Sequence, residues 1–497
     1  MVRMRVLLLN VPSRTTRERF IPLGLLYVAG IINREGHEAR IHDLYLHDIH
    51  LGRLDDLDRL VGTYKPEIIG FGGIASSYGK TKRLSIHLRQ KYPSILQMAG
   101  GSLASVYEYL LTRAPVDLVF HGETEGTLPV FLQRVEKNES REGIPGTSHR
   151  SGSGVHRNPP APQNEDLDTI PIPPYHLIDV REYLNRTRDF AGPLLDELAP
   201  GHREAILKRI EGKEQLLPII TSRGCTNRCS FCYRHMRGYR QHSVSYVVSH
   251  LKYLTNAYGI RAFGFSDELF NSNRKWVLDF CDAVEPLDIA YIIGGARINT
   301  VDPGILRRLR ETGCIGINYG QESGSDTILR EFRKGVTAEQ NRTVTLATRD
   351  QGIACPVQLV IGSPGETRET IRETLRFLNE VKARDPSVNY LIPFPGTPVW
   401  EEAVKRIPDV EKYLDEVAEH GGAPLVNLTC EPDRIWQSWA FMLKSEMKLA
   451  TRKWDGRRLS YVLAYPFFRV LERIYQFIPG GALRIMREAR DRPRRGG

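Results

Sequence analysis

The sequence contains no uninterrupted apolar run that approaches the roughly 18 to 20 residues a membrane-spanning helix needs. Its first residues, MVRMRVLLLNVPS, turn polar too soon for a secretory signal peptide. Cysteine is scarce, at seven residues in 497, and the first stands at position 225, so a disulfide-stapled scaffold is excluded. Hydrophobic residues make up 41% and charged residues 26% of the chain, which excludes a disordered protein. We therefore expect a cytoplasmic, globular protein of roughly two to four domains.

Net positive charge is small over most of the chain, although the formal net charge of the whole is +10. Residues 451–497 hold twelve Arg or Lys against four Asp or Glu, so eight of the ten net positive charges lie in this tail. The rest of the chain is nearly neutral, which argues against a chain-wide phosphate-binding surface. We expect no specific nucleic-acid partner. The tail is expected to form a helical cap with a basic end; the alternative is a peripheral contact with an anionic membrane.

Short apolar segments alternate with helix-like segments at the start of the chain. Residues 22–35 and 79–92 carry apolar side chains at helical spacing. Five strands are predicted around them, at residues 6–11, 38–43, 68–72, 95–99 and 116–121. Strands separated by helices predict an open, doubly wound parallel sheet, in which ligands bind at the carboxyl ends of the strands. Glycines stand at several of those ends.

A stretch rich in Gly, Ser and Pro at residues 143–165 predicts a domain boundary. Beyond it, six further strands are expected, at residues 217–221, 261–265, 290–294, 315–319, 356–361 and 388–392. Helix-like segments between them predict a partial (β/α)6 barrel, whose chemistry belongs at the carboxyl-terminal mouth. The expected α/β architecture is a Rossmann-like domain at 1–142, a connector at 143–213, the barrel at 214–400 and a helical region at 401–497.

Three cysteines crowd into the segment SRGCTNRCSFCY, where Cys225, Cys229 and Cys232 form C-x3-C-x2-C directly after the first barrel strand. Three thiolates are one short of a fully ligated [4Fe–4S] cluster and leave one iron open to bind a substrate or cofactor. A zinc site would need a fourth ligand, for which His235 is the candidate. Unrelated core cysteines are the third alternative. The crowding favours the cluster.

With this triad, the sequence resembles the radical S-adenosylmethionine (SAM) superfamily over residues 216–400. FSDELF at 265–270, GQESGSD at 320–326, GIACPVQLVIGSPGET at 352–367 and YLIPFPGTPVW at 390–400 match family segments in order and spacing. The resemblance implies that the open iron chelates SAM and that one electron cleaves SAM to methionine and a 5′-deoxyadenosyl radical. The implied SAM contacts are Phe231, Asp267, Glu268, Glu322 and Ser323.

Two other residues of the predicted barrel are candidates for the same region. Arg297 ends the third barrel strand and is a candidate contact for SAM or substrate, with a structural ion pair as the alternative. Cys355 lies beside a predicted strand, and we expect it to be a buried structural residue. No second cluster is expected, because Cys281, Cys314, Cys355 and Cys430 are far apart in the sequence.

The N-terminal segment is similar to the cobalamin-binding domains that are fused to radical SAM enzymes. The motifs are LLLNVPS at 7–13, IPLGLLYVAGII at 21–32, GFGGIASS at 70–77, MAGGSLAS at 98–105 and VDLVFHGETEGTLP at 116–129. Glycine at strand ends permits the close approach that a corrin ring requires. The domain has no cysteine, unlike the three-cysteine domain of the methylthiotransferases. The implied cobalamin contacts are Asn10, Ser13, Ser76, Gly100, Gly101, Ser102, Gly122 and Glu123.

Two familiar motifs are missing after the first strand. No G-x-G-x-x-G is present, which excludes a nicotinamide-binding Rossmann domain. The D-x-H-x-x-G motif of proteins that bind cobalt through histidine is replaced by NVPSRTTRERF. His50 has the wrong spacing and follows the second strand, so we expect it at the surface. The cobalt is therefore expected to lack a protein histidine.

These features predict a cobalamin-dependent radical SAM enzyme, most simply one that methylates an unactivated carbon of a small-molecule or lipid-like substrate. The resemblance implies that methylcobalamin supplies the methyl group, that a second SAM remethylates the cobalt, and that a low-potential flavodoxin or ferredoxin supplies electrons. A ring-forming or rearranging enzyme resembling the anaerobic tetrapyrrole cyclases is the second hypothesis. A non-catalytic, metal-bound RNA-binding or sensing protein is the third. The sequence does not specify the substrate.

Overall fold

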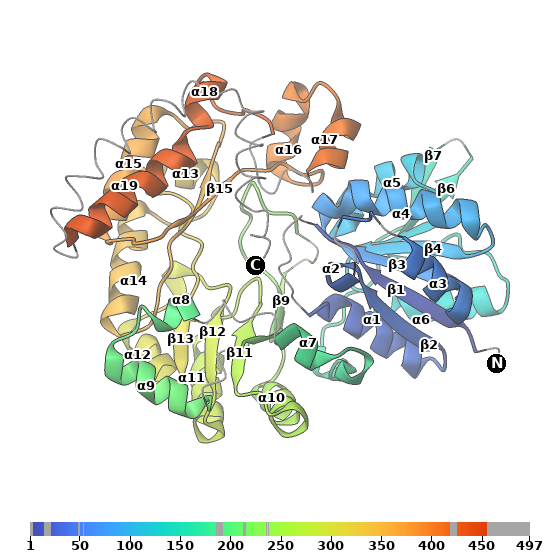
Figure 1. The fold of residues 1–497 in the computed structure, drawn as a ribbon, viewed down its shortest axis with the longest axis horizontal. Helices are drawn as coiled ribbons and strands as arrows, with labels where there is room; N and C mark the ends of the chain where they lie inside the picture. Colours follow the sequence, from blue (N-terminus) through green and yellow to red (C-terminus); the bar gives the residue numbers. More distant parts are fainter. Residues whose placement is uncertain are drawn as a thin grey trace, which may run out of the picture.

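A computed structural model describes residues 3–13, 21–47, 50–52, 54–152, 154–184, 192–211, 215–234, 236, 238–417 and 425–454. Within these ranges, a sheet domain with helices on both faces precedes a barrel of parallel strands and a group of C-terminal helices (Figure 1). The expected α/β class and the order of its parts are confirmed.

The N-terminal domain contains a seven-stranded sheet in the order β2-β1-β3-β4-β5-β6-β7. The first five strands are parallel: β1 (Arg5–Asn10), β2 (Glu38–Asp43), β3 (Ile68–Gly73), β4 (Leu96–Gly101) and β5 (Leu118–Phe120). The strand order reverses between β1 and β3, and this switch point is where ligands bind in open parallel sheets. The sheet therefore presents its binding edge at the carboxyl ends that the sequence predicts.

Helices cover both faces of this sheet, because successive strand residues point to opposite sides. Leu7 and Leu9 of β1 face one core, which α3, α4 and α5 complete, whereas Val6 and Leu8 face the core formed with α1 and α6. The helices are α1 (Leu23–Arg34), α2 (Leu44–His47), α3 (Asp55–Tyr64), α4 (Tyr78–Lys91), α5 (Tyr107–Arg113) and α6 (Thr127–Glu136). The apolar periodicity of residues 22–35 and 79–92 thus corresponds to α1 and α4.

The boundary expected at residue 142 falls inside this domain. Strands β6 (Thr147–Ser151) and β7 (Gly154–Arg157) form an antiparallel hairpin that extends the sheet beyond β5. The Gly- and Ser-rich segment lacks apolar alternation because β7 is an edge strand whose residues are mostly exposed. The connector therefore begins after residue 157, and its helices are α7 (Val180–Leu184), α8 (Gly192–Leu195) and α9 (Pro200–Arg209).

The second domain is the expected partial barrel. Its first part is a sheet of four parallel strands, β8 (Leu217–Ile219), β11 (Ala262–Phe265), β12 (Ala290–Ile293) and β13 (Cys314–Ile317). Isolated backbone bridges at Gly316 and Glu322 connect this sheet to the parallel pair β14 (Gln358–Ile361) and β15 (Ser387–Tyr390). The helices between them are α10 (Val244–Tyr258), α11 (Arg274–Val284), α12 (Pro303–Glu311), α13 (Asp326–Glu331), α14 (Ala338–Asp350) and α15 (Arg368–Glu380). Helix α10 ends at Gly259, whose φ of 69° suits a left-handed cap.

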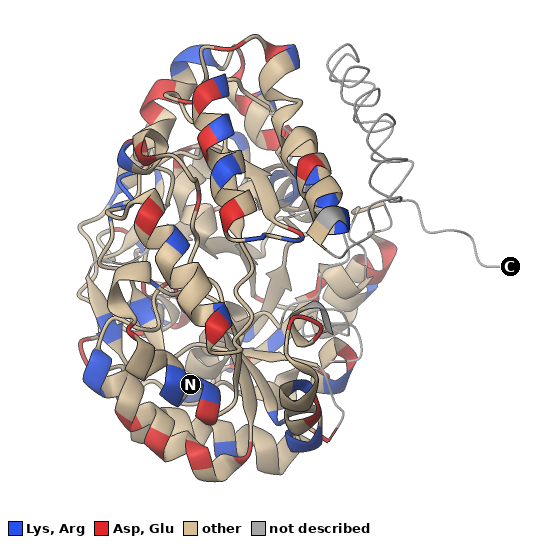
Figure 2. Cartoon of the chain, turned by 90° about the vertical axis from the view of Figure 1, so that its left-hand side faces the viewer, with Lys and Arg blue, Asp and Glu red and all other residues tan. Residues whose placement is uncertain are grey.

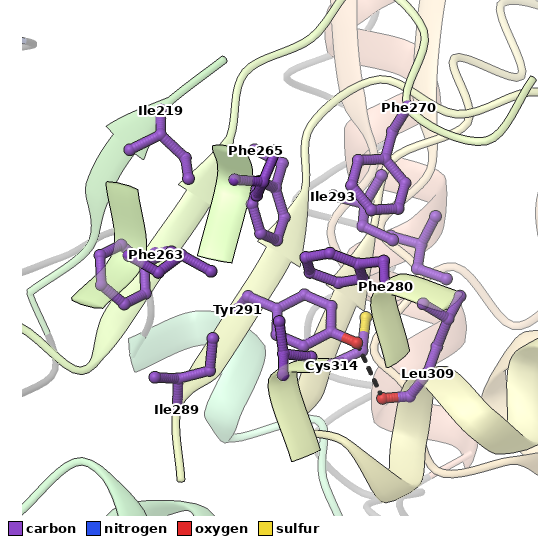
Figure 3. Packing of buried hydrophobic residues seen from close by; sticks show 14 of the residues in the cluster. Ile219, Phe263, Phe265, Phe270, Phe280, Ile289, Tyr291, Ile293, Leu309 and Cys314 are labelled. Carbon is purple, nitrogen blue, oxygen red and sulfur yellow. Dashed lines mark hydrogen bonds between the residues drawn. The ribbon is translucent and has the colours of Figure 1, made fainter. Parts of the chain in front are cut away.

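Aromatic side chains form the core between the barrel strands and helices α10 to α12 (Figure 3). Phe280 of α11 stacks on Trp276 and makes edge contacts with Phe265 and Tyr291. The Tyr291 hydroxyl lies 3.3 Å from the Leu309 carbonyl oxygen, so its polar atom is satisfied inside this core. This packing fixes the strands whose carboxyl ends carry the candidate site.

The helical C-terminal region joins the two domains. Its helices are α16 (Pro398–Ala403), α17 (Val410–Glu416), α18 (Asp433–Trp436) and α19 (Trp439–Trp454). Helix α17 packs on α4 of the N-terminal domain, where Lys82 forms ion pairs with Glu411 and Asp415. None of the helices in the described ranges combines the length and hydropathy required to cross a bilayer. The basic tail at 455–497 lies outside the described residues.

Candidate cofactor site

The three motif cysteines lie in one loop at the barrel mouth. The loop starts after β9 (Ser222–Gly224) and returns in β10 (Tyr239–Gln241), which pairs antiparallel with β9. All three thiols are free of disulfides. Cys229 is buried, and burial raises the pKa of its thiol although the Lys334 ammonium acts to lower it. The loop therefore presents three thiols within one short segment of chain.

Hydrogen bonds and an aromatic contact anchor this loop to the turn after α13. The Ser230 backbone N–H donates to the Phe332 carbonyl at 3.0 Å, and its hydroxyl donates to the Glu331 carbonyl at 3.0 Å. The ring of Phe231 packs edge-on against that of Phe332, with centroids 4.9 Å apart. In this structure Phe231 thus anchors the loop, and its contact with SAM stays a prediction.

Glu322 lies opposite the cysteine loop in a strained backbone conformation. Its φ is 61°, in the left-handed region that β-carbon-bearing residues seldom adopt. Its carboxylate lies 3.0 Å from the Lys334 Nζ, and the two side chains are only 11% and 16% exposed. The Lys334 carbonyl in turn accepts a hydrogen bond from Asn227 of the cysteine loop. Strain held in place by such contacts is typical of functional sites. Contact of Glu322 with SAM stays a prediction.

Ser323 is part of a buried hydrogen-bond network. Its hydroxyl lies 3.1 Å from the Thr374 hydroxyl, and its carbonyl accepts from the Asn341 side chain at 3.1 Å. Asn341 also donates to the Gln321 carbonyl at 2.9 Å. This network fixes the backbone on both sides of Glu322. Sequence reasoning missed Asn341 and Thr374, which stand on separate helices and match no motif of their own.

Asp267 and Glu268 are neighbours with different environments. The buried carboxylate of Asp267 accepts hydrogen bonds from the backbone N–H and the hydroxyl of both Thr221 and Ser222. Burial raises its pKa to about 6, although these donors act to lower it. Asp267 therefore fixes the strand end that leads into β9. Glu268 is exposed and lines the cavity described below. Contact of either carboxylate with SAM stays a prediction.

Arg297 reaches the cysteine loop, and among the described residues no ion pair of it is found. Its Nη1 donates to the Thr226 hydroxyl at 3.0 Å, whereas its buried Nε has no hydrogen-bond partner within the described part of the chain. Thr226 follows Cys225 directly, so Arg297 lies beside the first cysteine of the motif. Cys355 is fully buried, as expected, and lies 3.7 Å from the Gln321 amide nitrogen.

A cavity of about 510 Å³ separates the carboxyl edge of the N-terminal sheet from the barrel mouth. Five of the residues predicted to contact cobalamin line it: Asn10, Gly100, Gly101, Gly122 and Glu123. The barrel side contributes Ile220, Ser222, Arg223, Gly224, Met236, Ser266 and Glu268. Ser13, Ser76 and Ser102 are not among its lining residues in the described part of the chain, and their contact with cobalamin stays a prediction.

The strand ends suit a flat macrocycle. A β-carbon on Gly100 would have one heavy atom within 4 Å, the Phe120 Cβ at 3.7 Å, so the glycine leaves open cavity where a side chain would stand. Gly101 has a φ of 70°, which glycine adopts without strain. Strands β9 and β10 form the base of the cysteine loop, which we call its neck. The cavity lies between this neck and the glycine-lined edge of the sheet. These residues fit a corrin ring on the sheet and an iron–sulfur cluster in the loop.

The zinc alternative depends on His235, which lies outside the described residues. Within the described ranges, no three His, Cys, Asp or Glu side chains converge on a point that would hold a single metal ion. The separation of the three cysteine thiols does not conflict with a cluster, because each thiolate of a [4Fe–4S] site binds a different iron. His50 lies within the described residues and is exposed, as expected.

Comparison with known families agrees with both halves of the site. Residues 10–132 match the family model of the B12 binding domain, and residues 219–378 match that of the Radical SAM superfamily. An uncharacterized methyltransferase of Pyrococcus horikoshii is 27% identical over 413 residues, which cover 81% of this chain and 83% of that protein. The anaerobic magnesium-protoporphyrin IX monomethyl ester cyclase of Synechocystis is 26% identical over 368 residues, or 70% of this chain and 67% of that protein.

A solved structure shares the fold. The radical S-adenosylmethionine methyltransferase TsrM from Kitasatospora setae, with cobalamin and a [4Fe–4S] cluster bound, aligns with a TM-score of 0.64 at 19% identity. The alignment covers 81% of this chain and 75% of TsrM. The two family models support an enzyme with three cofactors, a [4Fe–4S] cluster, SAM and cobalamin, rather than a non-catalytic protein.

Proposed function

Because this chain is a radical SAM enzyme with an N-terminal B12-binding domain, we propose that it methylates an unactivated carbon in a cobalamin-dependent reaction. One observation carries the proposal. A single cavity is lined on one side by the glycine-rich sheet edge and on the other by the neck of the cysteine loop. Both cofactors would therefore act on a substrate held in the same space.

The residues that would hold each group are distinct. Cys225, Cys229 and Cys232 would ligate the cluster, and Glu322 would contact SAM beside it, with Lys334 holding its carboxylate in place. Gly100 and Gly101 would support the corrin, with the other lining residues around them. When bound, the reduced cluster supplies the electron that cleaves SAM, and cobalamin supplies a methyl carrier.

The chain itself would orient the substrate. Ile220 and Met236 are apolar residues on the barrel side of the cavity, and the polar groups there are Ser222, Arg223, Ser266 and Glu268. The lining as a whole is mainly apolar, which suits a small-molecule or lipid-like substrate. An external low-potential electron donor of the flavodoxin or ferredoxin type would reduce the cluster held by Cys225, Cys229 and Cys232.

Ring formation without methyl transfer is the second candidate. It is favoured by the similarity to the Synechocystis cyclase, which covers 70% of this chain. The architecture serves both reactions, since each begins with a radical that the cavity must shield. The two candidates differ in the fate of the SAM methyl group.

An isotope experiment separates these candidates. The reconstituted protein is incubated anaerobically with cobalamin, a low-potential reductant, SAM carrying a deuterated methyl group and a small-molecule extract. The proposal predicts a product that carries the label on carbon, together with S-adenosylhomocysteine. Consumption of SAM to 5′-deoxyadenosine with an unlabelled, oxidised product would contradict methyl transfer and favour the cyclase. A Cys229→Ala variant is the control for both outcomes.

A further inference from the structure

Two arginines lie side by side at the neck of the cysteine loop. Arg223 of β9 and Arg240 of β10 are direct cross-strand partners in a ribbon whose strands lead into and out of the loop. Like charges directly opposite on an antiparallel pair destabilise it. The neck is also tight, because a β-carbon on Gly224 would collide with the Gly238 carbonyl oxygen. A closed neck therefore requires anions beside the arginines.

Both anions come from the other domain. The Glu123 carboxylate binds Arg240 end-on, with both nitrogen–oxygen distances at 2.9 Å, and lies 3.2 Å from the Arg223 Nη1. Glu125 lies 2.7 Å from the Arg223 Nη2. These four side chains are 4% to 14% exposed. Paired guanidinium and carboxylate groups in such a buried, forked geometry hold a defined orientation.

The acidic segment belongs to the cobalamin half of the cavity. It follows β5, and Gly122 through Glu125 line the cavity together with Arg223 and Gly224 (Figure 1 shows β9 between the two domains). The Asn164 backbone N–H donates to the second oxygen of Glu123 at 3.0 Å. The Arg223 guanidinium also lies over the Tyr27 ring of α1, at 5.5 Å from the centroid. Both glutamates therefore pair with arginines of the neck at the wall of the cavity, and contact of Glu123 with cobalamin stays a prediction.

We propose that Glu123 and Glu125 are positioning residues for the cluster, placed on the B12-binding domain. They neutralise Arg223 and Arg240 and keep the neck of the cysteine loop closed. They also fix the position of the loop relative to the cobalamin edge of the cavity. Removal of both negative charges leaves two adjacent buried arginines without an anionic partner, although Arg240 still donates to the Asn164 carbonyl oxygen, and this is more costly than loss of an exposed pair. The neck then opens, and the cluster is held less firmly. The inference concerns cofactor retention and holds for methyl transfer or ring formation alike.

The test uses the full-length, anaerobically reconstituted protein with a Glu123→Gln/Glu125→Gln double substitution, which preserves side-chain shape. The rate of iron release to a ferrous chelator is measured by absorbance, with and without cobalamin. We expect release from the double variant to be at least about tenfold faster than from the wild type. We call the four paired side chains, Glu123 and Glu125 with Arg223 and Arg240, the inter-domain clamp. We also expect cobalamin to slow iron release in the wild type but not in the double variant, because the clamp links the cobalamin site to the cluster site.

Lys82→Met is the matched control. It breaks another inter-domain ion-pair cluster, in which a 15%-exposed lysine joins α4 to Glu411 and Asp415 of α17, away from the neck. Its iron release should equal that of the wild type. Equal acceleration in this control would refute a specific role for the clamp, as would wild-type release from the double variant. If circular dichroism shows that the double variant does not fold, the single variant Glu125→Gln replaces it, because it retains the Glu123–Arg240 pair. Unchanged iron release from this variant, together with an unchanged electron paramagnetic resonance spectrum of its reduced cluster, would then overturn the proposal.

Discussion

The placement of cobalamin on the sheet edge leads to a specific prediction for Gly100→Val. Gly100 is the penultimate residue of β4, next to Gly72 of β3 across the sheet, and lines the cavity. A β-carbon there meets only the Phe120 Cβ within 4 Å, at an ordinary contact distance of 3.7 Å. The added side chain would therefore enter the cavity where the corrin is expected, with little disturbance of the protein around it.

The expected magnitudes follow from this geometry. Valine suits a strand, so the change in folding stability should stay within about 1 kcal/mol. Overfilling a packed contact with extra methyl groups costs about 1 to 3 kcal/mol, which corresponds to about 5- to 150-fold weaker binding of cobalamin. Gly100→Ala adds one methyl group and should have a smaller effect in the same direction. Cobalamin affinity should thus fall while the fold persists.

The assay is a titration of the full-length protein with aquocobalamin, followed by tryptophan fluorescence quenching, alongside thermal unfolding by circular dichroism. Gly62→Val is the control, because Gly62 lies on α3 outside the cavity and has no heavy atom within 4 Å of its β-carbon position. The control should bind as the wild type does. Wild-type affinity in Gly100→Val would refute the placement of the corrin on this edge of the sheet.

Three further predictions concern the cluster, the inter-domain clamp and the barrel core. After reconstitution, Cys229→Ala should lack the iron and its visible absorbance. Cys281→Ala, which alters a buried thiol of α11, should retain both. Iron bound to Cys229→Ala would contradict the assignment of Cys229 as a ligand. Burial alone would raise the pKa of Glu123, but Arg240 and Arg223 hold it below its ordinary range, so its contribution to stability is present near neutral pH and lost as pH falls through that lowered value. The difference in melting temperature between wild type and Glu123→Gln should therefore stay constant from about pH 7 to about pH 5 and shrink as the pH falls below about 4, and a difference that grows in acid would contradict the ion-pair account. Phe280→Ala should destabilise the barrel by about 3 to 5 kcal/mol, because it leaves a cavity at a fully buried site between four aromatic rings. A midpoint of urea unfolding equal to that of the wild type would contradict this packing.

The sequence predicts most of the fold because its core residues follow simple periodicities. Buried parallel strands read as continuous apolar runs, such as Val6 to Leu9, and amphipathic helices show the 3.6-residue repeat. The hairpin of β6 and β7 escaped this reasoning because an exposed edge strand has no apolar face to detect. The domain boundary was consequently expected too early.

The site was predicted where a motif carries the chemistry and missed where contacts are distant in sequence. Cys225, Cys229 and Cys232 share one short segment, so their grouping is visible in the sequence. The partners of Glu123 lie 100 and 117 residues away, at Arg223 and Arg240, and no local pattern indicates such pairs. Charges of both signs are interspersed over the outer helices (Figure 2), so a single arginine or glutamate gives no sign of its partner.

The proposed function depends on one cavity that brings the neck of the cysteine loop and the cobalamin edge of the sheet together. The most direct test is anaerobic SAM turnover with cobalamin and a low-potential reductant, in which 5′-deoxyadenosine and S-adenosylhomocysteine are measured together. We predict both products from the wild type, undiminished 5′-deoxyadenosine with less S-adenosylhomocysteine from Gly100→Val at sub-saturating cobalamin, and neither product from Cys229→Ala. Undiminished formation of both products by Gly100→Val, or of either product by Cys229→Ala, would contradict this arrangement.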